Sequence, residues 1–143
     1  MIQNDIDLDT LVGFLRQVDN AFPIPLSKKV NIYDYSRKIH KYGKSLAYMD
    51  NGRVVGLALY YDNNQQSKTA YLSMIAVLKE YQGRGIASKL LDTFIRKSRY
   101  AGMLTVELYT HKTNLQAIRL YEKSGFSFGL DNSRPDDIKF SIN

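Results

Sequence analysis

Apolar residues in the first part of the chain recur every three or four positions, which is the spacing of one face of a helix. This pattern predicts a first helix over about residues 8–21, with Asp7 as its N-cap. The prolines within residues 23–25 then require an extended segment, because proline cannot continue a helix. The same spacing predicts a second helix that follows Ser27, as its N-cap, and ends at Gly43.

From residue 45 the pattern changes to the apolar and polar alternation that is typical of strands. Ser45–Met49 and Arg53–Tyr61 are predicted to pair as a hairpin, because the Asn51-Gly52 turn between them accepts positive φ. Ala70–Leu78 is apolar on both faces, which indicates a strand covered from both sides. We therefore expect this strand at the centre of the sheet.

The second half of the chain alternates between helices and strands. The predicted elements are a helix with a wide apolar stripe from Ala87 to Ala101, a strand over Leu104–Thr110, a helix over Leu115–Ser124 between its cap Asn114 and Gly125, and a hairpin of Phe126–Leu130 and Ile138–Ile142. The complete order, ααβββαβαββ, predicts a single α/β (α+β) domain over residues 1–143, with a mixed sheet and helices on both faces.

The composition narrows the class of protein. The chain has 143 residues, a hydrophobic fraction of 44% and a charged fraction of 24%, as expected for one globular domain with its own core. It has no cysteine, which excludes disulfides, thiolate metal sites and a cysteine nucleophile. The first residues do not have the pattern of a signal peptide, and no stretch approaches the roughly 20 apolar residues of a membrane span. We expect a cytoplasmic protein without a membrane partner.

The net charge of +6 indicates either a merely basic surface or a polyanionic partner. The basic residues are only loosely grouped, and the sequence has no nucleic-acid module and no GxxxxGK[ST] loop, so nucleic acid is not the expected partner. A small phosphorylated cofactor fits better. Its natural place is the loop Gln82–Ala87, where Gly83 and Gly85 remove side chains ahead of a helix and leave backbone N–H groups free for phosphate.

Two motifs in the chain resemble those of the GCN5-related N-acetyltransferase (GNAT) superfamily. Gln82-Gly83-Arg84-Gly85-Ile86-Ala87 matches the family's acetyl-CoA loop, Q/R-x-x-G-x-G/A, and follows a strand that ends in Ile75-Ala76-Val77. The stretch from Asn114 to Phe126, NLQAIRLYEKSGF, matches the family's N-x-x-A-x-x-x-Y-x-x-x-G-F segment. The resemblance implies a mixed, mostly antiparallel sheet with splayed central strands, and an acyltransferase that uses acetyl-CoA and no metal.

The resemblance also implies where acetyl-CoA would bind. The backbone of residues 75–77 would hydrogen-bond the pantetheine arm, provided that a bulge near residues 74–77 splays the central strand from its neighbour. The loop N–H groups would hold the pyrophosphate, with Arg84 adding positive charge. Asn114 would contact the cofactor arm, cap its helix, or do both. The expected cofactor-binding residues are Ile75, Ala76, Val77, Gln82, Gly83, Arg84, Gly85, Ile86, Ala87, Ser88 and Asn114.

Tyr121, the tyrosine of the second motif, is the predicted catalytic residue. By resemblance it would lie near the thioester sulfur and protonate the leaving thiolate, for which a phenol is a suitable donor. The alternative is a tyrosine that only packs, because Leu115, Ile118 and Tyr121 lie roughly on one face of their helix.

The general base that should deprotonate the acceptor amine is less clearly marked. At the two positions where members of the family carry a glutamate, this chain has Tyr71 and Tyr109. The remaining candidates are Glu107, which shares strand parity with Tyr109, His111, whose intrinsic pKa is suitable, and a chain of ordered water. For Glu107 and His111 an ordinary surface role is the alternative.

The acceptor site is expected between the first two helices, the Asp62–Lys68 turn and the last hairpin loop. Residues that could line it are Phe22, Pro23, Ile24, Tyr33, Tyr35, Tyr60, Tyr61, Tyr71 and Tyr109. Eleven tyrosines and no tryptophan indicate an amphipathic pocket, suited to sugars or small polar amines, although most tyrosines could simply pack in the core.

The predicted function is that of an acetyl-CoA-dependent N-acetyltransferase acting on a primary amine of a small molecule, for example an amino sugar. The transfer would be a direct attack in a ternary complex, because no nucleophile for a covalent acyl-enzyme is apparent. A peptide or protein amine is a second acceptor class. Two other functions are a catalytically weak acetyl-CoA sensor or assembly module and a basic nucleotide-binding protein. Resemblance to the family leaves a homodimer open.

Overall fold

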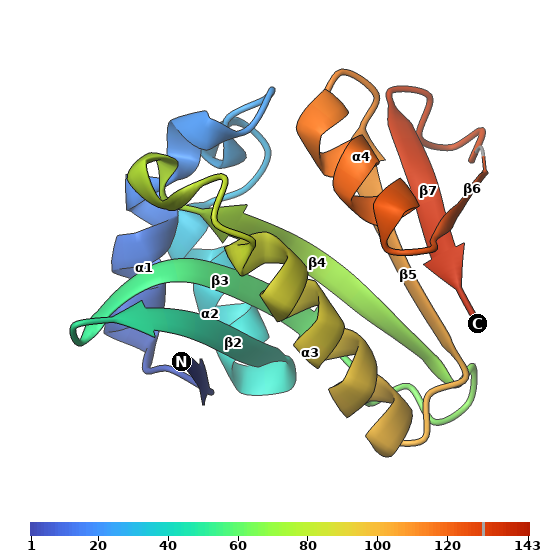
Figure 1. The fold of residues 1–143 in the computed structure, drawn as a ribbon, viewed down its shortest axis with the longest axis horizontal. Coiled ribbons are helices and arrows are strands. Elements are labelled where there is room, and N and C mark those ends of the chain that lie inside the picture. Colours follow the sequence, from blue (N-terminus) through green and yellow to red (C-terminus); the bar gives the residue numbers. More distant parts are fainter. Residues whose placement is uncertain (130) are drawn as a thin grey trace.

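A computed structural model describes residues 1–129 and 131–143. Its strands form one sheet in the order β1-β2-β3-β4-β5-β7-β6, and every neighbouring pair is antiparallel except β4 and β5. The strands are β1 (Ile2–Asn4), β2 (Lys44–Asp50), β3 (Arg53–Tyr61), β4 (Thr69–Val77), β5 (Thr105–His111), β6 (Ser127–Gly129) and β7 (Asp137–Ile142). Figure 1 shows β4 at the centre, as its apolar sequence predicts.

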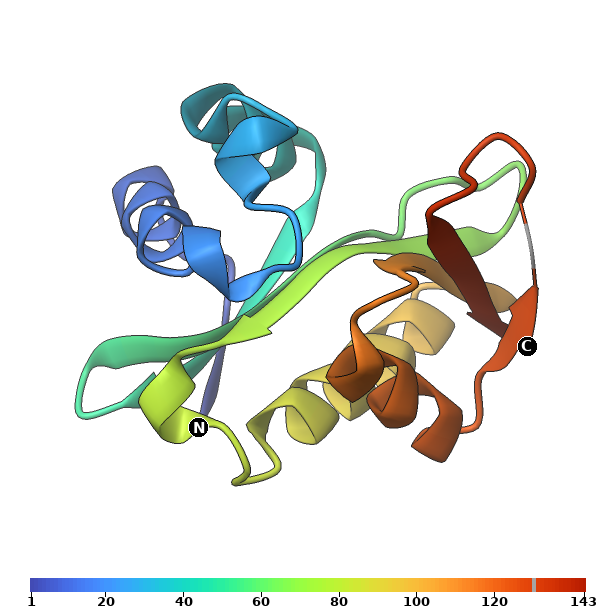
Figure 2. The same ribbon diagram turned by 90° about the horizontal axis from the view of Figure 1, so that it is seen from above.

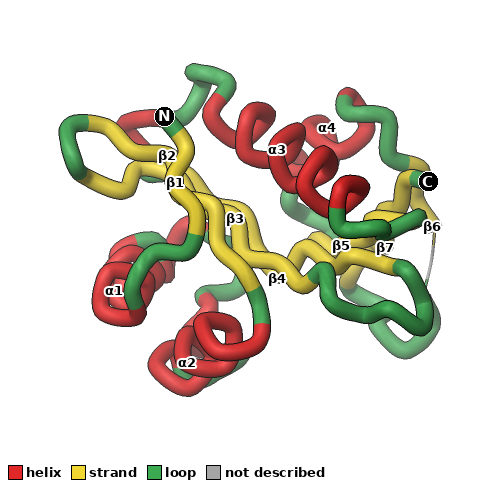
Figure 3. Tube along the Cα trace, turned by 90° about the horizontal axis from the view of Figure 1, so that it is seen from below, coloured by secondary structure: helices red, strands yellow, loops and turns green. Residues whose placement is uncertain are grey.

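Two helices cover each face of the sheet. The helices are α1 (Leu8–Gln17), α2 (Ile32–Tyr42), α3 (Ile86–Tyr100) and α4 (Leu115–Lys123). Figures 2 and 3 show α1 and α2 on one face, and α3 and α4 on the other. The predicted mixed, mostly antiparallel sheet with helices on both faces is confirmed. None of the helices in the described residues is long and apolar enough to cross a bilayer.

Close packing of α3 on β3 fixes where α3 begins. A Cβ atom on Gly56 of β3 would lie 2.8 Å from Cγ2 of Ile86, so only glycine allows this approach. Further along the same two elements, the rings of Tyr60 and Phe94 pack with their centroids 4.8 Å apart. The first turn of α3, and with it the preceding glycine loop, is therefore held directly against the sheet.

The central strands β4 and β5 separate along their length. They pair only from Thr69 to Leu72 on β4 and from Thr105 to Leu108 on β5. On the other side of β4, Met74 pairs with Leu59 and Leu72 pairs with Tyr60, so Ser73 is an extra residue in this register. The predicted splay is confirmed, but the bulge lies at Ser73, just before the expected residues 74–77. In Figure 1 the two strands diverge beyond this point.

Beyond Ser73, β4 has no strand partner on its β5 side within the described chain. We call this edge, residues 73–77, the open edge of β4. Its backbone groups are free on that side for a ligand to pair with, in the manner of an added strand.

Two predictions in the first part of the chain need correction. The first helix ends at Gln17 rather than near residue 21, and Asp19–Ala21 forms a separate 3-10 turn. Ser27 does not cap the second helix. Its backbone N–H and its hydroxyl both bind the Asp19 carboxylate, and Asn31 caps α2 by accepting a hydrogen bond from the Asp34 N–H at 3.0 Å.

At the two ends of the chain, the short strand β1 was not predicted. In the last hairpin the first strand covers Ser127–Gly129 rather than Phe126–Leu130, and Leu130 lies outside the described residues.

Candidate active site

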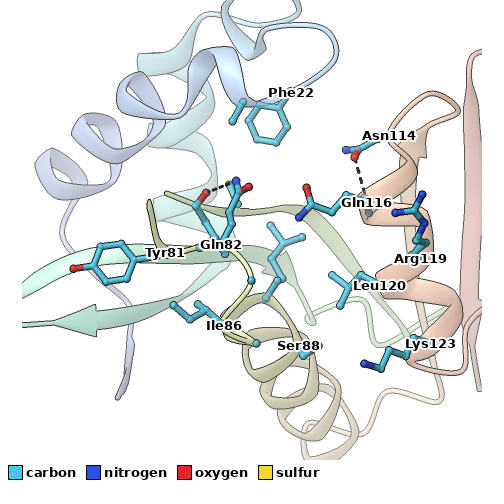
Figure 4. A pocket seen from close by; sticks show the side chains of 18 residues that line it. Phe22, Tyr81, Gln82, Ile86, Ser88, Asn114, Gln116, Arg119, Leu120 and Lys123 are labelled. Atoms are coloured by element: carbon cyan, nitrogen blue, oxygen red, sulfur yellow. Dashed lines mark hydrogen bonds between the residues drawn. The ribbon is translucent and has the colours of Figure 1, made fainter. Parts of the chain in front are cut away.

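A cavity of about 310 Å³ opens beside the open edge of β4, between the start of α3 and one face of α4 (Figure 4). We call it the loop cavity, because the glycine loop forms one of its walls. Its lining residues are Ala21, Phe22, Ile75, Ala76, Val77, Tyr81, Gln82, Gly83, Gly85, Ile86, Ala87, Ser88, Asn114, Gln116, Ala117, Arg119, Leu120 and Lys123. No carboxylate occurs among these described residues, so the lining is suited to an anionic ligand.

The structure brings the expected cofactor-binding residues together in this cavity, with the exception of Arg84. The loop geometry explains why glycine is needed. Gly83 and Gly85 have φ angles of 80° and 78°, which L-residues rarely adopt, and a Cβ added at either position would meet no protein atom within 4 Å. The space beside both glycines is thus left open.

Gln82 ties this loop to the end of β4. Its Nε2 donates to the backbone carbonyl oxygen of Val77 at 3.1 Å. The contact joins the two segments that sequence reasoning assigned to different parts of the cofactor, and it fixes the loop relative to the open edge.

The positive charge of the loop cavity comes from α4 rather than from Arg84. Arg84 lies over the Tyr81 ring, 4.6 Å from its centroid, and donates to the Glu80 carbonyl oxygen at 3.0 Å. Arg119 and Lys123 line the cavity instead. Figure 4 shows both on α4, across the cavity from Ile86 and Ser88. Sequence reasoning missed these two residues, although a spacing of four places them on one helix face.

A second cavity of about 300 Å³ adjoins the first at the Ser73 end of the open edge. We call it the tyrosine cavity. It is lined by Phe22, Pro23, Ile24, Leu26, Lys29, Val30, Tyr35, Tyr71, Leu72, Ser73, Met74, Ile75, Leu108, Tyr109, Thr110, His111, Asn114, Ala117, Tyr121 and Arg134. Four of these residues, Phe22, Ile75, Asn114 and Ala117, line the loop cavity as well. The two cavities therefore meet where β4 parts from β5.

Asn114 stands at this junction and caps α4, because its side-chain oxygen accepts a hydrogen bond from the Ala117 N–H at 3.3 Å. One side chain thus combines the capping role with a position in the lining of both cavities.

Tyr121 lines the tyrosine cavity and is 4% exposed. Its ring packs against Phe126 and Phe140, with centroids 5.9 and 5.5 Å away. Burial raises the pKa of Tyr121, so its phenol stays protonated at neutral pH. The residue has the packing contacts of a core tyrosine and also lines the tyrosine cavity, but it does not line the loop cavity.

The candidate bases differ in position. Glu107 does not line the tyrosine cavity, and its carboxylate lies 3.3 Å from the Lys139 Nζ. His111 lines the cavity, but its Nδ1 accepts a hydrogen bond from the Thr113 N–H at 3.2 Å. The same Nδ1 lies 2.7 Å from the Thr113 hydroxyl, so Thr113 already engages this ring nitrogen through two groups.

The residues expected to line the acceptor site divide into two groups. Phe22, Pro23, Ile24, Tyr35, Tyr71 and Tyr109 line the tyrosine cavity, whereas Tyr33, Tyr60, Tyr61 and the Asp62–Lys68 turn do not. Tyr60 packs on Phe94 at the α3 face of the sheet, and Tyr33 is 45% exposed on α2. Lys29, Ser73 and Arg134 belong to the lining but were missed, because loops and bulges carry no periodic signal that would place them.

In the part of the chain that the structure describes, no three His, Asp or Glu side chains gather in a group that could hold a metal ion.

Comparison with known proteins gives a consistent result. The family model described as "Acetyltransferase (GNAT) family" matches residues 10–126. The chain is 28% identical over 116 residues to N-alpha-acetyltransferase 30 of Schizosaccharomyces pombe, which covers 79% of this chain and 77% of that protein. It is 31% identical over 108 residues to a probable spermine N(1)-acetyltransferase of Bacillus subtilis subsp. natto, which covers 71% and 70%.

A solved structure of a putative acetyltransferase from Salmonella typhimurium with its cofactor acetyl-CoA superposes with a TM-score of 0.75. The sequence identity is 20%, and the match covers 100% of this chain and 92% of that one. At this identity the likeness shows a common fold.

Proposed function

Since the chain belongs to the acetyltransferase (GNAT) family and acetyl-CoA is the donor in this family, we propose that it acetylates a primary amine of a small molecule. The observation that carries the proposal is the junction of the two cavities at the open edge of β4. The donor would occupy the loop cavity and the acceptor the tyrosine cavity, so that the two meet without a covalent acyl-enzyme.

Residues of the loop cavity offer cations, backbone N–H groups and open space that suit acetyl-CoA. The loop around Gly83 and Gly85 offers backbone N–H groups and open space, and the α4 wall offers two cations for phosphate oxygens, Arg119 and Lys123. The backbone of residues 75–77 would hydrogen-bond the pantetheine arm along the open edge. Gln82 would keep loop and edge in register, and Asn114 would stand beside the thioester end. When bound, acetyl-CoA supplies an activated acyl group and a thiolate leaving group.

Tyr121 would hold the proton that the leaving sulfur needs. Its burial keeps the Oη protonated across the neutral range, and it lines the tyrosine cavity about one turn of α4 after Ala117, which lines both cavities. Its packing against Phe126 and Phe140 would fix the direction of the phenol.

We propose that the acceptor amine loses its proton through water rather than to a carboxylate. The described lining of the tyrosine cavity contains no Asp or Glu, and Glu107 is paired with Lys139 outside it. His111 is the one imidazole in that lining, and Thr113 already engages its Nδ1. Hydroxyls of Tyr35, Tyr71 and Ser73 offer groups that could order such water.

The lining also indicates the general character of the acceptor. Four tyrosines supply flat apolar surface with polar ends, which suits a small polar amine such as an amino sugar. A cavity of about 300 Å³ is also at the small end of the range found for ligand sites.

Thiol release tests the proposal. Purified protein is incubated with acetyl-CoA and a broad panel of amines, and free CoA thiol is followed with time. We expect release that depends on an acceptor and that falls at least tenfold in Tyr121→Phe, with Tyr33→Phe as a matched control on an exposed helix tyrosine. Tight acetyl-CoA binding without release for any acceptor would instead identify an acetyl-CoA sensor.

A further inference from the structure

The charge of the tyrosine cavity points to a narrower class of acceptor. Its described lining holds two permanent cations, Lys29 and Arg134, and no carboxylate. We propose that the acceptor carries an anionic group, a carboxylate or a phosphate, a few bonds from its primary amine. The inference rests on the proposed function in one respect, the assignment of the tyrosine cavity to the acceptor.

Arg134 is held in place before any ligand arrives. Its guanidinium carbon lies 3.7 Å from the centroid of the Tyr109 ring, its Nε donates to Oδ2 of Asp137 at 3.0 Å, and its Nη2 lies 2.9 Å from the same oxygen. These contacts engage one edge of a guanidinium that carries five N–H groups. A planar cation stacked on a ring and anchored on one edge presents its other N–H groups in a fixed direction, which suits a carboxylate or phosphate.

Lys29 supplies a second cation from a distant part of the chain. It follows the 3-10 turn at Leu26–Lys28, is exposed, and forms no ion pair with any described residue. Figure 2 shows its segment and the loop before β7 on the face of the sheet that carries α1 and α2. Two segments separated by about a hundred residues of sequence thus bring positive charge to one cavity, and neither charge belongs to the loop cavity.

The nearby carboxylates lie outside the lining of the cavity, although Asp137 pairs with Arg134. Asp131 accepts hydrogen bonds from the Tyr109 hydroxyl at 2.8 Å and from Ser133. Asp137 holds Arg134, and Glu107 lies 3.3 Å from the Lys139 Nζ. None of the three lines the tyrosine cavity. A polyamine acceptor would meet two cations here without a carboxylate to bind its second amine, so the lining disfavours that class.

This inference is tested with pairs of acceptors in which only one member carries the anionic group. Phosphoethanolamine is compared with ethanolamine, β-alanine with β-alaninamide, and a tetrapeptide with an acidic second residue with its amide counterpart, while spermidine represents polycations. The first two pairs report on free small molecules and the third on peptides. The measurement is kcat/KM from thiol release, for the wild-type chain and for Arg134→Gln and Lys29→Gln.

Control variants separate charge in the cavity from loop stability. Asp137→Asn removes the partner of Arg134 but keeps the guanidinium, and Lys28→Gln removes a neighbouring exposed charge that does not line the cavity. We expect the wild-type chain to prefer at least one anionic acceptor over the matched acceptor that lacks the anionic group. We expect Arg134→Gln to reduce that preference at least tenfold through KM, and Lys29→Gln to reduce it severalfold. Lys28→Gln should leave it unchanged, and Asp137→Asn should keep most of it.

Equal preference in the wild type and Arg134→Gln, or spermidine as the best acceptor, would overturn the inference while the proposed function stands. If no amine releases thiol, the proposed function fails, and binding decides the inference separately. Saturation-transfer NMR on protein loaded with CoA would then compare phosphoethanolamine with ethanolamine. Binding of the phosphate compound that disappears in Arg134→Gln would support the anion site, and absence of binding would overturn it.

Discussion

The hydroxyl of Tyr35 lies 2.5 Å from the Oγ of Ser73, and this contact joins α2 to the bulge of β4. Ser73 is the extra residue at which β4 leaves β5, and both side chains line the tyrosine cavity. A helix on one face of the sheet therefore anchors the point from which the two cavities diverge. The contact suggests that the splay is held by side chains as well as by strand register.

Removal of the Tyr35 hydroxyl should lower the free energy of unfolding at neutral pH. It should also make the loss of stability at high pH smaller. Burial, with a smaller opposing effect of the Ser73 hydrogen bond, raises the pKa of Tyr35 to about 12. At neutral pH, Tyr35→Phe should cost about 1 kcal/mol, because a partly buried hydrogen bond is lost.

The raised pKa of Tyr35 also has a defined effect on stability against pH. A phenol whose folded pKa exceeds its unfolded value of about 10 contributes stability that is complete below pH 10 and is lost as pH rises toward 12. The Phe variant should lack this part of the decline, up to about 3 kcal/mol. Urea unfolding at pH 8 to 12 measures it, and identical slopes for both proteins would contradict it.

Gly85 and Gly52 offer a matched pair for testing the glycine loop. Their φ angles are 78° and 76°, and a Cβ at either position would contact no atom within 4 Å. Alanine at each site should therefore cost a similar amount, about 1 kcal/mol, from backbone strain. Only Gly85→Ala should also weaken acetyl-CoA binding, by about tenfold, because its methyl group would occupy the space where the phosphate is expected to bind.

Isothermal calorimetry with acetyl-CoA and thermal unfolding would separate the two effects. Unchanged affinity in Gly85→Ala, with the expected loss of stability, would mean that the phosphates do not bind beside this glycine. Loss of affinity in Gly52→Ala would mean that backbone strain alone perturbs the site.

The α4 cations should matter more for the cofactor than Arg84 does. Exchange of both Arg119 and Lys123 for Gln is expected to raise the Kd of acetyl-CoA about ten- to a hundredfold, because charge-assisted contacts to phosphate are lost. The salt dependence of binding should also become shallower. Arg84→Gln should change affinity less than threefold, because its side chain lies on Tyr81 and Glu80. A larger effect of Arg84→Gln than of the double variant would reverse this assignment.

Local sequence signals predicted most of the fold, because periodicity and capping act over a few residues. Asp7 does cap α1, with the Thr10 N–H 2.8 Å from its carboxylate, and Asn114 caps α4. Ser27 misled the prediction because Asp19, eight residues earlier, takes both of its hydrogen-bonding groups. The strand β1 has only three residues, which is too short for an alternating pattern to mark it.

In the candidate site too, the parts made of consecutive residues could be predicted and the parts made of distant residues could not. The glycine loop and Asn114 could be predicted because their chemistry depends on consecutive residues, whereas the acceptor wall is assembled from distant ones. Arg134 pairs with Asp137, three residues later, but it is placed in the cavity by stacking on Tyr109, and no local pattern in the sequence predicts that contact. For Arg84 the motif predicted the position of the backbone in the glycine loop. It did not predict the direction of the side chain, which lies over the Tyr81 ring.

Glu107 and His111 provide the test of proton removal through water. Glu107 lies outside the tyrosine cavity and is paired with Lys139, so Glu107→Gln should leave kcat/KM within about threefold of the wild-type value. His111→Gln should lower it modestly, less than about tenfold, because a glutamine still accepts a hydrogen bond from the Thr113 N–H. Neither change should move the pH at which the rate rises, since that pH would then reflect the acceptor amine itself.

The pH profile of kcat/KM decides between these roles more firmly than a rate at one pH. A base on the protein gives an inflection at its own pKa, and that inflection disappears when the base is replaced. Profiles of the two variants with two acceptors of different amine pKa should shift with the acceptor and not with the variant. If His111→Gln instead removed the inflection and lowered the rate a hundredfold, the Nδ1 contact with Thr113 would have to open during turnover, and the imidazole would be the base.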